Sequence, residues 1–388
     1  MLTTLAVANY RSLRNLQVPL RRLNVVTGAN GSGKSSVYRA LRLLADTARD
    51  SGVGPALARE GGLNSTLWAG PEKFSRGMRR GNVPVQGTLR TEPVNLKLGF
   101  AGDDFSYSIE LGLSTPSESI FANDPAIKRE CIWHGPAFRP SALTVDRHYA
   151  TVRIKGDDGE WNVAVHAVSP FDSMMSQLAD PRSAPELLRL REQIRSWRFY
   201  DHFRTDSEAL ARQPQVGTYT PVLGHDGADL AAAWQTVAEI GDRQALGTAV
   251  EDAFPGGRIA VQNREGRFEI VMQQHGLLRT LSAAELSDGT LRYLLWIAAL
   301  LTPRPPALLV LNEPETSLHP DLLPALGRLI IHASASTQVL VVSHAAPLIA
   351  TLEGTPECNS IRLEKKLGET RLADVGEFDL APWPWPPR

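Results

Sequence analysis

The sequence contains a short run of small and polar residues, GANGSGKS (28–35), whose composition is suited to binding phosphate groups. Glycines let consecutive backbone N–H groups turn toward one anion, and the N-terminus of a following helix adds the positive end of its dipole. In such a loop the lysine reaches the β- and γ-phosphates of a nucleotide, and the next hydroxyl ligates Mg²⁺. We therefore expect a nucleotide site, the phosphate loop, with Ser35 on the metal and these residues at the phosphates: Gly28, Ala29, Asn30, Gly31, Ser32, Gly33, Lys34, Ser35 and Ser36.

A second set of polar residues ends the apolar run ALLVL (307–311) in the sequence ALLVLNEPETSLHP. A buried strand that ends in a carboxylate is a common frame for a hydrolytic site, because a glutamate at its tip can act as general base toward water. Glu313 has this position. The residue before it is the neutral Asn312, whose side-chain carbonyl can still accept a hydrogen bond from a metal-bound water. Asn312 lacks the negative charge that an acid would place there, and Glu313 or Glu315, which lies just beyond the strand, can return part of it.

The spacing of apolar residues indicates which elements would position these groups. LNVV (23–26) predicts a strand directly before the phosphate loop, and Val37, Leu41 and Leu44 recur at helical spacing after it. Strand, loop and helix in this order are the context that a phosphate-binding loop of this type requires. A purely structural glycine-rich turn is the less favoured interpretation.

The rest of the chain predicts a mixed α/β protein. Alternating apolar and polar residues indicate antiparallel strands over 83–113 and 127–168, the second with a hairpin turn at GDDG. The apolar runs ALLVL and QVLVV favour parallel strands that are covered on both faces. Three helices are also expected: one from about Ala184, one for which Asp229 can be the cap, and one from about Ser287. A hairpin is expected over 257–274, and the C-terminal segment LAPWPWPPR (380–388) is expected to be extended.

Three motifs in the C-terminal part follow the order found in ATP-binding-cassette (ABC) ATPases. They are LSDGT (286–290), LNEPETSLHP (311–320) and VLVVSH (339–344): a signature sequence, an acid-tipped strand and a strand that ends in histidine. With NYRSLRNLQVPLRRLNVVTGANGSGKS (9–35), they make the chain resemble the soluble RecF/SMC-type branch, in particular the OLD (overcoming lysogenisation defect) group of AAA ATPases. The resemblance covers both ends of the chain and is loose in the middle.

The resemblance implies a role for each matching residue. ATP with Mg²⁺ would bind at the phosphate loop, Glu313 would be the general base, and His344 would be the switch histidine at the γ-phosphate. Ser287 and Gly289 would contact ATP bound to a second copy, so two chains would form a homodimer across ATP. Each residue also has a structural interpretation. Ser287 can simply cap a helix, and His344 can be a core or surface histidine.

Three further positions follow from the same resemblance. Arg11 would lie near the phosphates, although it can equally be a solvated side chain on an edge strand. Gln177 is the candidate for a glutamine that reaches the metal from the junction of the lobes. Asn312 stands where the relatives usually have an aspartate that holds Mg²⁺, typically through a water. We therefore expect Mg-ATP to bind and to be hydrolysed slowly, until a partner or DNA completes the site.

The composition is that of a soluble globular protein, 43% hydrophobic and 21% charged, with a formal net charge of −1. This charge does not support nucleic-acid binding by the whole surface. Two cysteines far apart argue against a disulfide framework. There is no signal-peptide pattern, and the longest apolar run, YLLWIAALL (293–301), is too short to span a bilayer, so we expect a cytoplasmic protein without a membrane contact. A local basic cluster, which can also be a solvated loop, consists of Lys73, Arg76, Arg79 and Arg80.

We therefore expect an α/β fold, a P-loop NTPase with an ABC-type ATPase head, in which a mixed sheet and an antiparallel β subdomain join a helical lobe with the signature. This single domain would divide into an N-terminal lobe (1–175), a helical region (176–280) and a C-terminal lobe (281–388). The expected function is ATP hydrolysis in DNA repair or anti-phage defence, with DNA and a separate effector, nuclease or toxin, as candidate partners. OLD relatives often carry a C-terminal Toprim nuclease domain, and because the segment after His344 is short, we expect the ATPase half alone. The alternatives are a transporter ATPase subunit and a nucleotide switch that does not hydrolyse.

Overall fold

The computed structural model describes residues 1–49, 52–85, 93–113, 120–121, 123–156, 158–178, 182, 184–376 and 383–387. The chain forms two compact units. The first unit comprises Met1–Arg21, Val26–Trp197 and Ile361–Arg388, and the second comprises Arg22–Val25 and Arg198–Ser360.

This division differs from the three consecutive segments expected from the sequence. Helix α6 (Pro185–Ser196) belongs to the first unit, and strand β17 (Cys358–Lys366) begins in the second unit and ends in the first. Strand β3 (Leu23–Gly28) likewise crosses from the second unit into the first. Each unit is therefore built from segments that are distant in the sequence, because long-range strand pairing, rather than chain order, decides which residues pack together.

An eight-stranded antiparallel sheet forms most of the first unit, in the order β2-β1-β4-β5-β6-β7-β8-β9. The antiparallel strands expected within 127–168 are present as β6 to β9. Of the stretch 83–113, residues 83–85 and 93–95 lie outside any strand and 86–92 lie outside the described residues. Residues 96–113 form β4 and β5 with the turn between them. The strands are β1 (Leu2–Tyr10), β2 (Leu13–Pro19), β4 (Leu96–Gly102), β5 (Phe105–Leu113), β6 (Pro125–His134), β7 (Leu143–His148), β8 (Thr151–Lys155) and β9 (Trp161–Val165).

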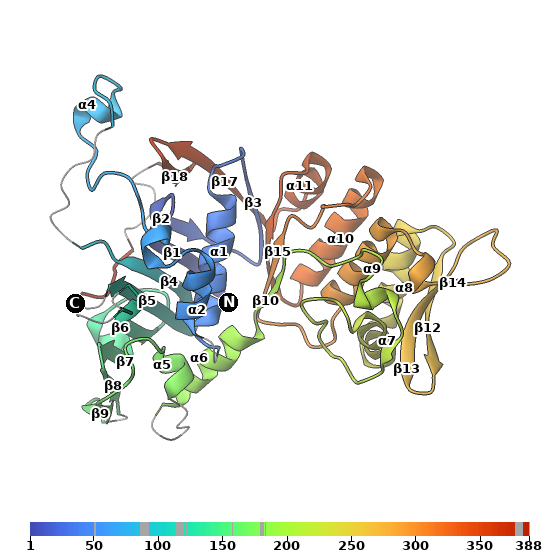
Figure 1. The fold of residues 1–388 in the computed structure, drawn as a ribbon, viewed down its shortest axis with the longest axis horizontal. Coiled ribbons are helices and arrows are strands. Elements are labelled where there is room, and N and C mark those ends of the chain that lie inside the picture. Colours follow the sequence, from blue (N-terminus) through green and yellow to red (C-terminus); the bar gives the residue numbers. More distant parts are fainter. Residues whose placement is uncertain are drawn as a thin grey trace. The chain divides into compact units, whose positions relative to one another are not determined.

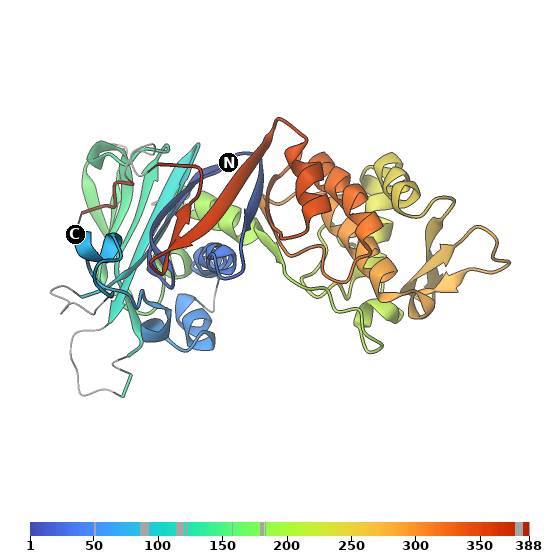
Figure 2. The ribbon, with the colours of Figure 1, turned by 90° about the horizontal axis from the view of Figure 1, so that it is seen from above.

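One face of this sheet packs against α1 (Lys34–Asp46) and α6, as both views of the ribbon show (Figures 1 and 2). Side chains alternate between the faces of a strand, and the residues that point to these helices are large and apolar. Phe100 of β4 is fully buried, with its ring centroid 5.4 Å from that of Trp197. The unit also contains short helices: α2 (Val53–Arg59), α3 (Leu63–Thr66), α4 (Arg76–Arg79) and α5 (Met174–Gln177).

The second unit contains the two all-apolar strands, which are parallel as the sequence predicted. β15 (Leu308–Asn312) lies between β10 (Arg198–Tyr200) and β16 (Gln338–Val342), and both pairings are parallel. The start of β3 follows β16 in the same sheet, where the N–H of Val339 donates to the carbonyl of Arg22 over 2.8 Å. Parallel strands place their C-terminal ends at one edge, so the polar residues that follow β15 and β16 come together there.

Helices cover these strands. In α9 (Asp288–Leu300) every residue from Leu291 to Leu300 is buried, which is the pattern of a helix enclosed on all sides. No helix among the residues that the structure describes is long and apolar enough to span a membrane. The other elements of the unit are α7 (Leu230–Ile240), α8 (Arg243–Ala253), α10 (Leu323–Ser334), α11 (Ala346–Glu353), the hairpin of β12 (Arg258–Arg264) and β13 (Arg267–Gln273), and the short strands β11 (Gln215–Val216) and β14 (Leu281–Ser282).

Candidate functional site

The phosphate loop lies in the first unit between the end of β3 and the start of α1, in the strand–loop–helix context expected from the sequence. The Lys34 ammonium donates to the carbonyls of Gly28 (2.7 Å) and Ala29 (3.2 Å), so the loop curls around its own lysine. Ser35 is exposed one residue into α1 and can ligate Mg²⁺ at the positive end of the helix dipole. The loop thus has the shape and the charge to hold a phosphate chain.

Two glycines of the loop are required by packing as well as by conformation. Gly28 and Gly33 have positive φ angles of 143° and 109°. A methyl group on Gly28 would lie 2.3 Å from the carbonyl oxygen of Leu363, and one on Gly33 would lie 2.3 Å from Oγ1 of Thr370. Both contacts come from the hairpin of β17 and β18 (Glu369–Leu372). A hairpin from the far end of the sequence therefore backs the loop.

Thr370 makes the hydrogen bonds that join this hairpin to the phosphate loop. Its hydroxyl lies 2.7 Å from the carbonyl oxygen of Ser32 and 2.8 Å from Oγ of Ser12, and its N–H donates to the carbonyl of Ser12 over 2.8 Å. The side chain is almost completely buried. Thr370 therefore ties the phosphate loop to the turn between β1 and β2, a connection for which the sequence carried no signal.

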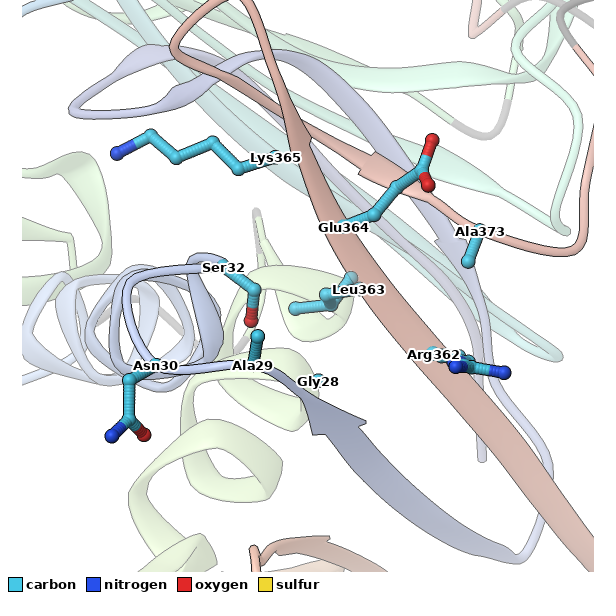
Figure 3. Close-up of a pocket in the computed structure, with 9 residues that line it drawn as sticks. All are labelled: Gly28, Ala29, Asn30, Ser32, Arg362, Leu363, Glu364, Lys365 and Ala373. Carbon is cyan, nitrogen blue, oxygen red and sulfur yellow. The ribbon is translucent and has the colours of Figure 1, made fainter.

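A pocket of about 650 Å³ opens beside the loop, a size typical of small-ligand sites. Figure 3 shows Leu363 and Lys365 on the face of β17 that points toward the loop, whereas Arg362 and Glu364 point the other way. Ser32 is buried in the pocket wall, and its hydroxyl has no hydrogen-bond partner within the described part of the chain. The pocket thus offers a cation and an unused hydroxyl next to the loop.

Arg11 lies in the turn that Thr370 ties to the loop, with a φ of 50°. Its guanidinium donates to Oε2 of Glu60 from Nη2 (2.6 Å) and Nε (3.1 Å), and the Tyr10 hydroxyl donates to the same oxygen over 2.7 Å. Burial raises the pKa of Tyr10, so the phenol keeps its proton and remains a donor. Arg11 is therefore close to the loop but is held by a carboxylate.

Gln177 is not brought to the phosphate loop. It is exposed at the end of α5, which packs against α6. Tyr107 links α5 to the C-terminal end of α1. The Glu130 carboxylate accepts hydrogen bonds from the Tyr107 hydroxyl and from Ser173, the N-cap of α5, and Tyr107 also hydrogen-bonds Thr47, the C-cap of α1. The loop is at the N-terminal end of α1, about 20 Å away for a helix of this length. The expectation that Gln177 reaches the metal is therefore wrong, because α5 packs at the opposite end of the helix.

In the second unit, Asn312 and Glu313 stand at the C-terminal end of β15. The N–H of Glu313 donates to the carbonyl of Val342 at the end of β16 over 2.8 Å, which holds the glutamate backbone in a left-handed conformation with a φ of 49°. Its side chain is 44% exposed and can reach a water molecule. Asn312 is partly buried beside it and offers an amide where a carboxylate would bind Mg²⁺ more strongly.

Glu315 organises the loop after β16. Its Oε1 accepts hydrogen bonds from the hydroxyl of Ser343 (2.8 Å) and from the backbone N–H groups of His344 (2.9 Å) and Ala345 (3.2 Å). The His344 ring places Nδ1 at 3.3 Å from the same oxygen and 3.8 Å from Oε1 of Glu313. The structure thus brings Glu313 and His344 together, and the buried Glu315 is the residue that joins them.

The signature sequence begins α9 in the same unit. Ser287 is the N-cap residue, and its hydroxyl accepts the N–H of Thr290 over 3.1 Å, so the capping interpretation holds while the residue stays exposed. Arg212, which the sequence did not indicate, donates to the carbonyl of Leu286 and to Oδ1 of Asp288, each over 2.6 Å. A methyl group on Gly289 would lie 3.2 Å from the carbonyl oxygen of Ser317, in the turn that follows Glu313. The start of α9 therefore lies beside that turn.

Residues 23–350 match a family model described as "AAA domain, putative AbiEii toxin, Type IV TA system". The chain belongs to this AAA family. No match is found among curated proteins.

Solved structures similar to this AAA chain include heads of SMC proteins. The SMC head bound to the C-terminal winged-helix domain of ScpA aligns with a TM-score of 0.51 at 12% identity, over 97% of this chain and 98% of that one. The SMC head domain from Thermotoga maritima aligns with a TM-score of 0.44 at 14% identity, over 97% and 99% of the two chains. The expected α/β fold of a P-loop NTPase with an ABC-type head is thereby confirmed.

We expect replacement of Glu315 by alanine to release the loop at 343–345. Each buried donor left without an acceptor costs about 1–3 kcal/mol, so the amides of His344 and Ala345 should exchange hydrogen much faster, as mass spectrometry of a peptide over 338–353 would measure. Glu315→Gln is the matched control, since it keeps an oxygen at the same place and should protect both amides nearly as in the wild type. Equal exchange in all three proteins would contradict this role of Glu315.

Proposed function

We propose that this chain binds Mg-ATP and hydrolyses it, as a member of the RecF/SMC-like branch of ABC-type ATPases with motifs close to those of the OLD group. The observation that carries the proposal is the phosphate loop. Lys34 is held by the loop carbonyls of Gly28 and Ala29, at the N-terminus of a helix and next to the exposed Ser35. These are the groups that bind a nucleoside triphosphate and its metal ion.

The roles in hydrolysis follow from the chemistry of the second unit. Glu313 accepts a proton from the attacking water, for which its exposed carboxylate is suited. His344 responds to the γ-phosphate, and Glu315 keeps its backbone in one conformation. Ser35 and Asn312 are the residues that would hold Mg²⁺, which neutralises charge on the phosphates. With only an amide at 312, the metal loses one negative neighbour, so turnover is slow without a further component.

Two copies act together in this proposal. Ser287 is exposed at the start of α9, and Gly289 leaves the backbone there uncovered by a side chain, so both can approach ATP held by a second copy. The order of the motifs, with the signature before the acid-tipped strand, supports this composite arrangement. We therefore propose a homodimer that forms across ATP.

The same proposal includes DNA and a separate effector protein as partners, in DNA repair or anti-phage defence. The residues Lys73, Arg76, Arg79 and Arg80 are all exposed around α4, and cations of this kind bind phosphate groups without reading sequence. One of the similar SMC heads was solved with a domain of a partner protein bound. The description of the AAA family as a putative toxin of a toxin–antitoxin system agrees with a defence role.

A magnesium titration of ATP turnover tests both the activity and the part played by Asn312. Replacing Asn312 by aspartate restores one negative charge beside the dication, which is worth on the order of 1–3 kcal/mol in a partly solvated site. We expect the wild type to release phosphate slowly, and Asn312→Asp to need about tenfold less Mg²⁺ for half-maximal turnover. Phosphate release would be measured against magnesium concentration, with and without DNA.

Asn312→Ser is the control, since it removes the amide without adding charge and should need at least as much magnesium as the wild type. An unchanged magnesium requirement in Asn312→Asp would contradict the electrostatic account. A wild type that binds ATP but never turns it over, beside an active Asn312→Asp, would make the protein a nucleotide switch. A chain that does not bind ATP at all would end the proposal.

A further inference from the structure

The face of the antiparallel sheet that points away from α1 carries a row of small side chains. Gly99 of β4 pairs with Ser108 of β5, and Ser108 pairs with Cys131 of β6. Paired residues lie side by side on one face, so these three form the floor of a channel across the strands.

The channel is bordered by larger residues on both sides. On one side is Trp133, which pairs with Ser106. On the other side is a charged row of paired residues, Lys97, Glu110 and Arg129.

This channel, which we call the tail groove, is filled by the segment WPWPP (383–387), the tail, which lies on the side of the sheet away from α1 (Figures 1 and 2). The Trp383 ring centroid is 5.9 Å from that of Trp133, and its Cζ2 would be 3.3 Å from a methyl group on Gly99. The absence of a side chain at Gly99 therefore makes room for the indole. Trp385 packs edge-on against Trp383, with ring centroids 5.7 Å apart.

The charged edge of the groove contacts the second half of the tail. The Lys97 ammonium is 5.8 Å from the ring centroid of Trp385, within the range of a cation–π contact. Pro386 is buried, and a small cavity beside it is lined by Ser108, Glu110 and Arg129. Both aromatic residues and a proline of the tail thus have a defined place on the sheet.

The chemistry of the tail is that of a recognition segment. Alternating prolines fix the backbone in an extended form before binding, so that little conformational entropy is lost when the segment docks. Proline-rich segments bind grooves lined by aromatic side chains in this way. Yet Nε1 of Trp383 is buried and has no hydrogen-bond partner among the residues that the structure describes. An unsatisfied donor weakens the contact, which suits a segment that leaves the groove and returns.

We propose that the tail groove is a recognition site for an extended tryptophan–proline segment, that the tail is its built-in occupant, and that a partner protein with such a segment binds by displacing it. The partner is defined by this chemistry: two tryptophans separated by proline, the second with a ring face open to the Lys97 ammonium. The site lies wholly within the first unit and is independent of the nucleotide chemistry proposed above.

The test uses the full chain with Trp383→Ala and Trp385→Ala, which empties the groove. The probe is a fluorescent peptide with the sequence APWPWPPR (381–388), and its binding is followed by fluorescence anisotropy. We expect saturable binding to the double variant and at least about tenfold weaker binding to the wild type, because a tethered competitor acts at a high effective concentration. A peptide with alanine at both tryptophans should not bind. Adding Lys97→Glu to the double variant should weaken binding severalfold.

Three results would overturn the proposal. The first is a folded double variant that does not bind the peptide. The second is a wild type that binds it as tightly as the double variant does. The third is loss of the folded circular dichroism spectrum both in the double variant and in a chain that ends at Gly376, which would make the tail a fixed part of the fold.

Discussion

Lys34→Ala is expected to remove ATP binding. The ammonium is the one side-chain cation of the phosphate loop, and its loss removes charge-assisted hydrogen bonds to the phosphates worth about 1.5–3 kcal/mol each. With two such bonds lost, Kd for ATP should rise by a factor of a hundred or more, since about 2.7 kcal/mol corresponds to a hundredfold change. Fluorescence of a labelled ATP analogue would give Kd, and phosphate release measured on the same preparation would give the rate of hydrolysis.

The lysine also holds the loop together, so the control must separate binding from folding. In the structure its ammonium donates to two loop carbonyls, and the side chain is 7% exposed. Lys34→Met keeps most of the buried stem and removes only the charge, so it should bind ATP as weakly as Lys34→Ala while unfolding at a urea concentration closer to that of the wild type. If either variant binds and hydrolyses ATP as the wild type does, the nucleotide site lies elsewhere.

The phosphate loop shows how far local sequence carries the prediction. The strand, the glycines, the lysine and the helix are contiguous, and each has a strong local preference, so their arrangement followed from GANGSGKS and its neighbours. The hairpin behind the loop could not be predicted in the same way. Thr370 is an ordinary residue in an ordinary strand, and its importance arises only when β18 is placed against Ser12 and Ser32. No spacing in the sequence encodes that long-range contact.

The residues that follow β15 and β16 likewise could be predicted only in part. The tips of two parallel strands must share an edge, so the proximity of Glu313 and His344 was implicit in the two apolar runs. The structural role of Glu315 was not implicit in those runs. The sequence suggested it as a source of charge near the metal, whereas the structure gives one of its oxygens three donors from the loop at 343–345. Which of several acids is buried depends on packing, and burial decides whether a carboxylate serves structure or solvent.

Gln177 was misplaced because its assignment came from position in the chain rather than from a motif. The transition from strands to helices near 177 does occur, but α5 packs on α6 at the C-terminal end of α1. The sequence did not indicate Arg212 for a different reason. It lies far from the signature in sequence, yet its guanidinium contacts the carbonyl of Leu286 and the carboxylate of Asp288. A buried arginine that holds a functional loop has no local signal.

Glu313→Gln and Gly289→Asp should have opposite effects on assembly, and both effects should be large. Glutamine keeps the shape and hydrogen bonding of Glu313 but cannot accept the proton of the attacking water. We therefore expect turnover to fall by a factor of about 100 or more, in the range that a general base contributes, while bound ATP and the dimer accumulate. Light scattering with and without Mg-ATP would show the mass of one chain changing to that of two.

Gly289→Asp places a carboxylate where the γ-phosphate of a second copy's ATP is expected. Two like charges a few ångströms apart repel by about 1 kcal/mol or more even in water, and the phosphate carries more than one charge. The variant should thus bind ATP at its own phosphate loop and yet remain a monomer, also when combined with Glu313→Gln. Gly289→Ala is the matched control, because the methyl group meets the carbonyl of Ser317 at 3.2 Å without adding charge and should weaken the dimer less. A mass of one chain in Glu313→Gln at saturating Mg-ATP would rule out the homodimer across ATP. A dimer in Gly289→Asp would show instead that the signature does not face the nucleotide of the second copy.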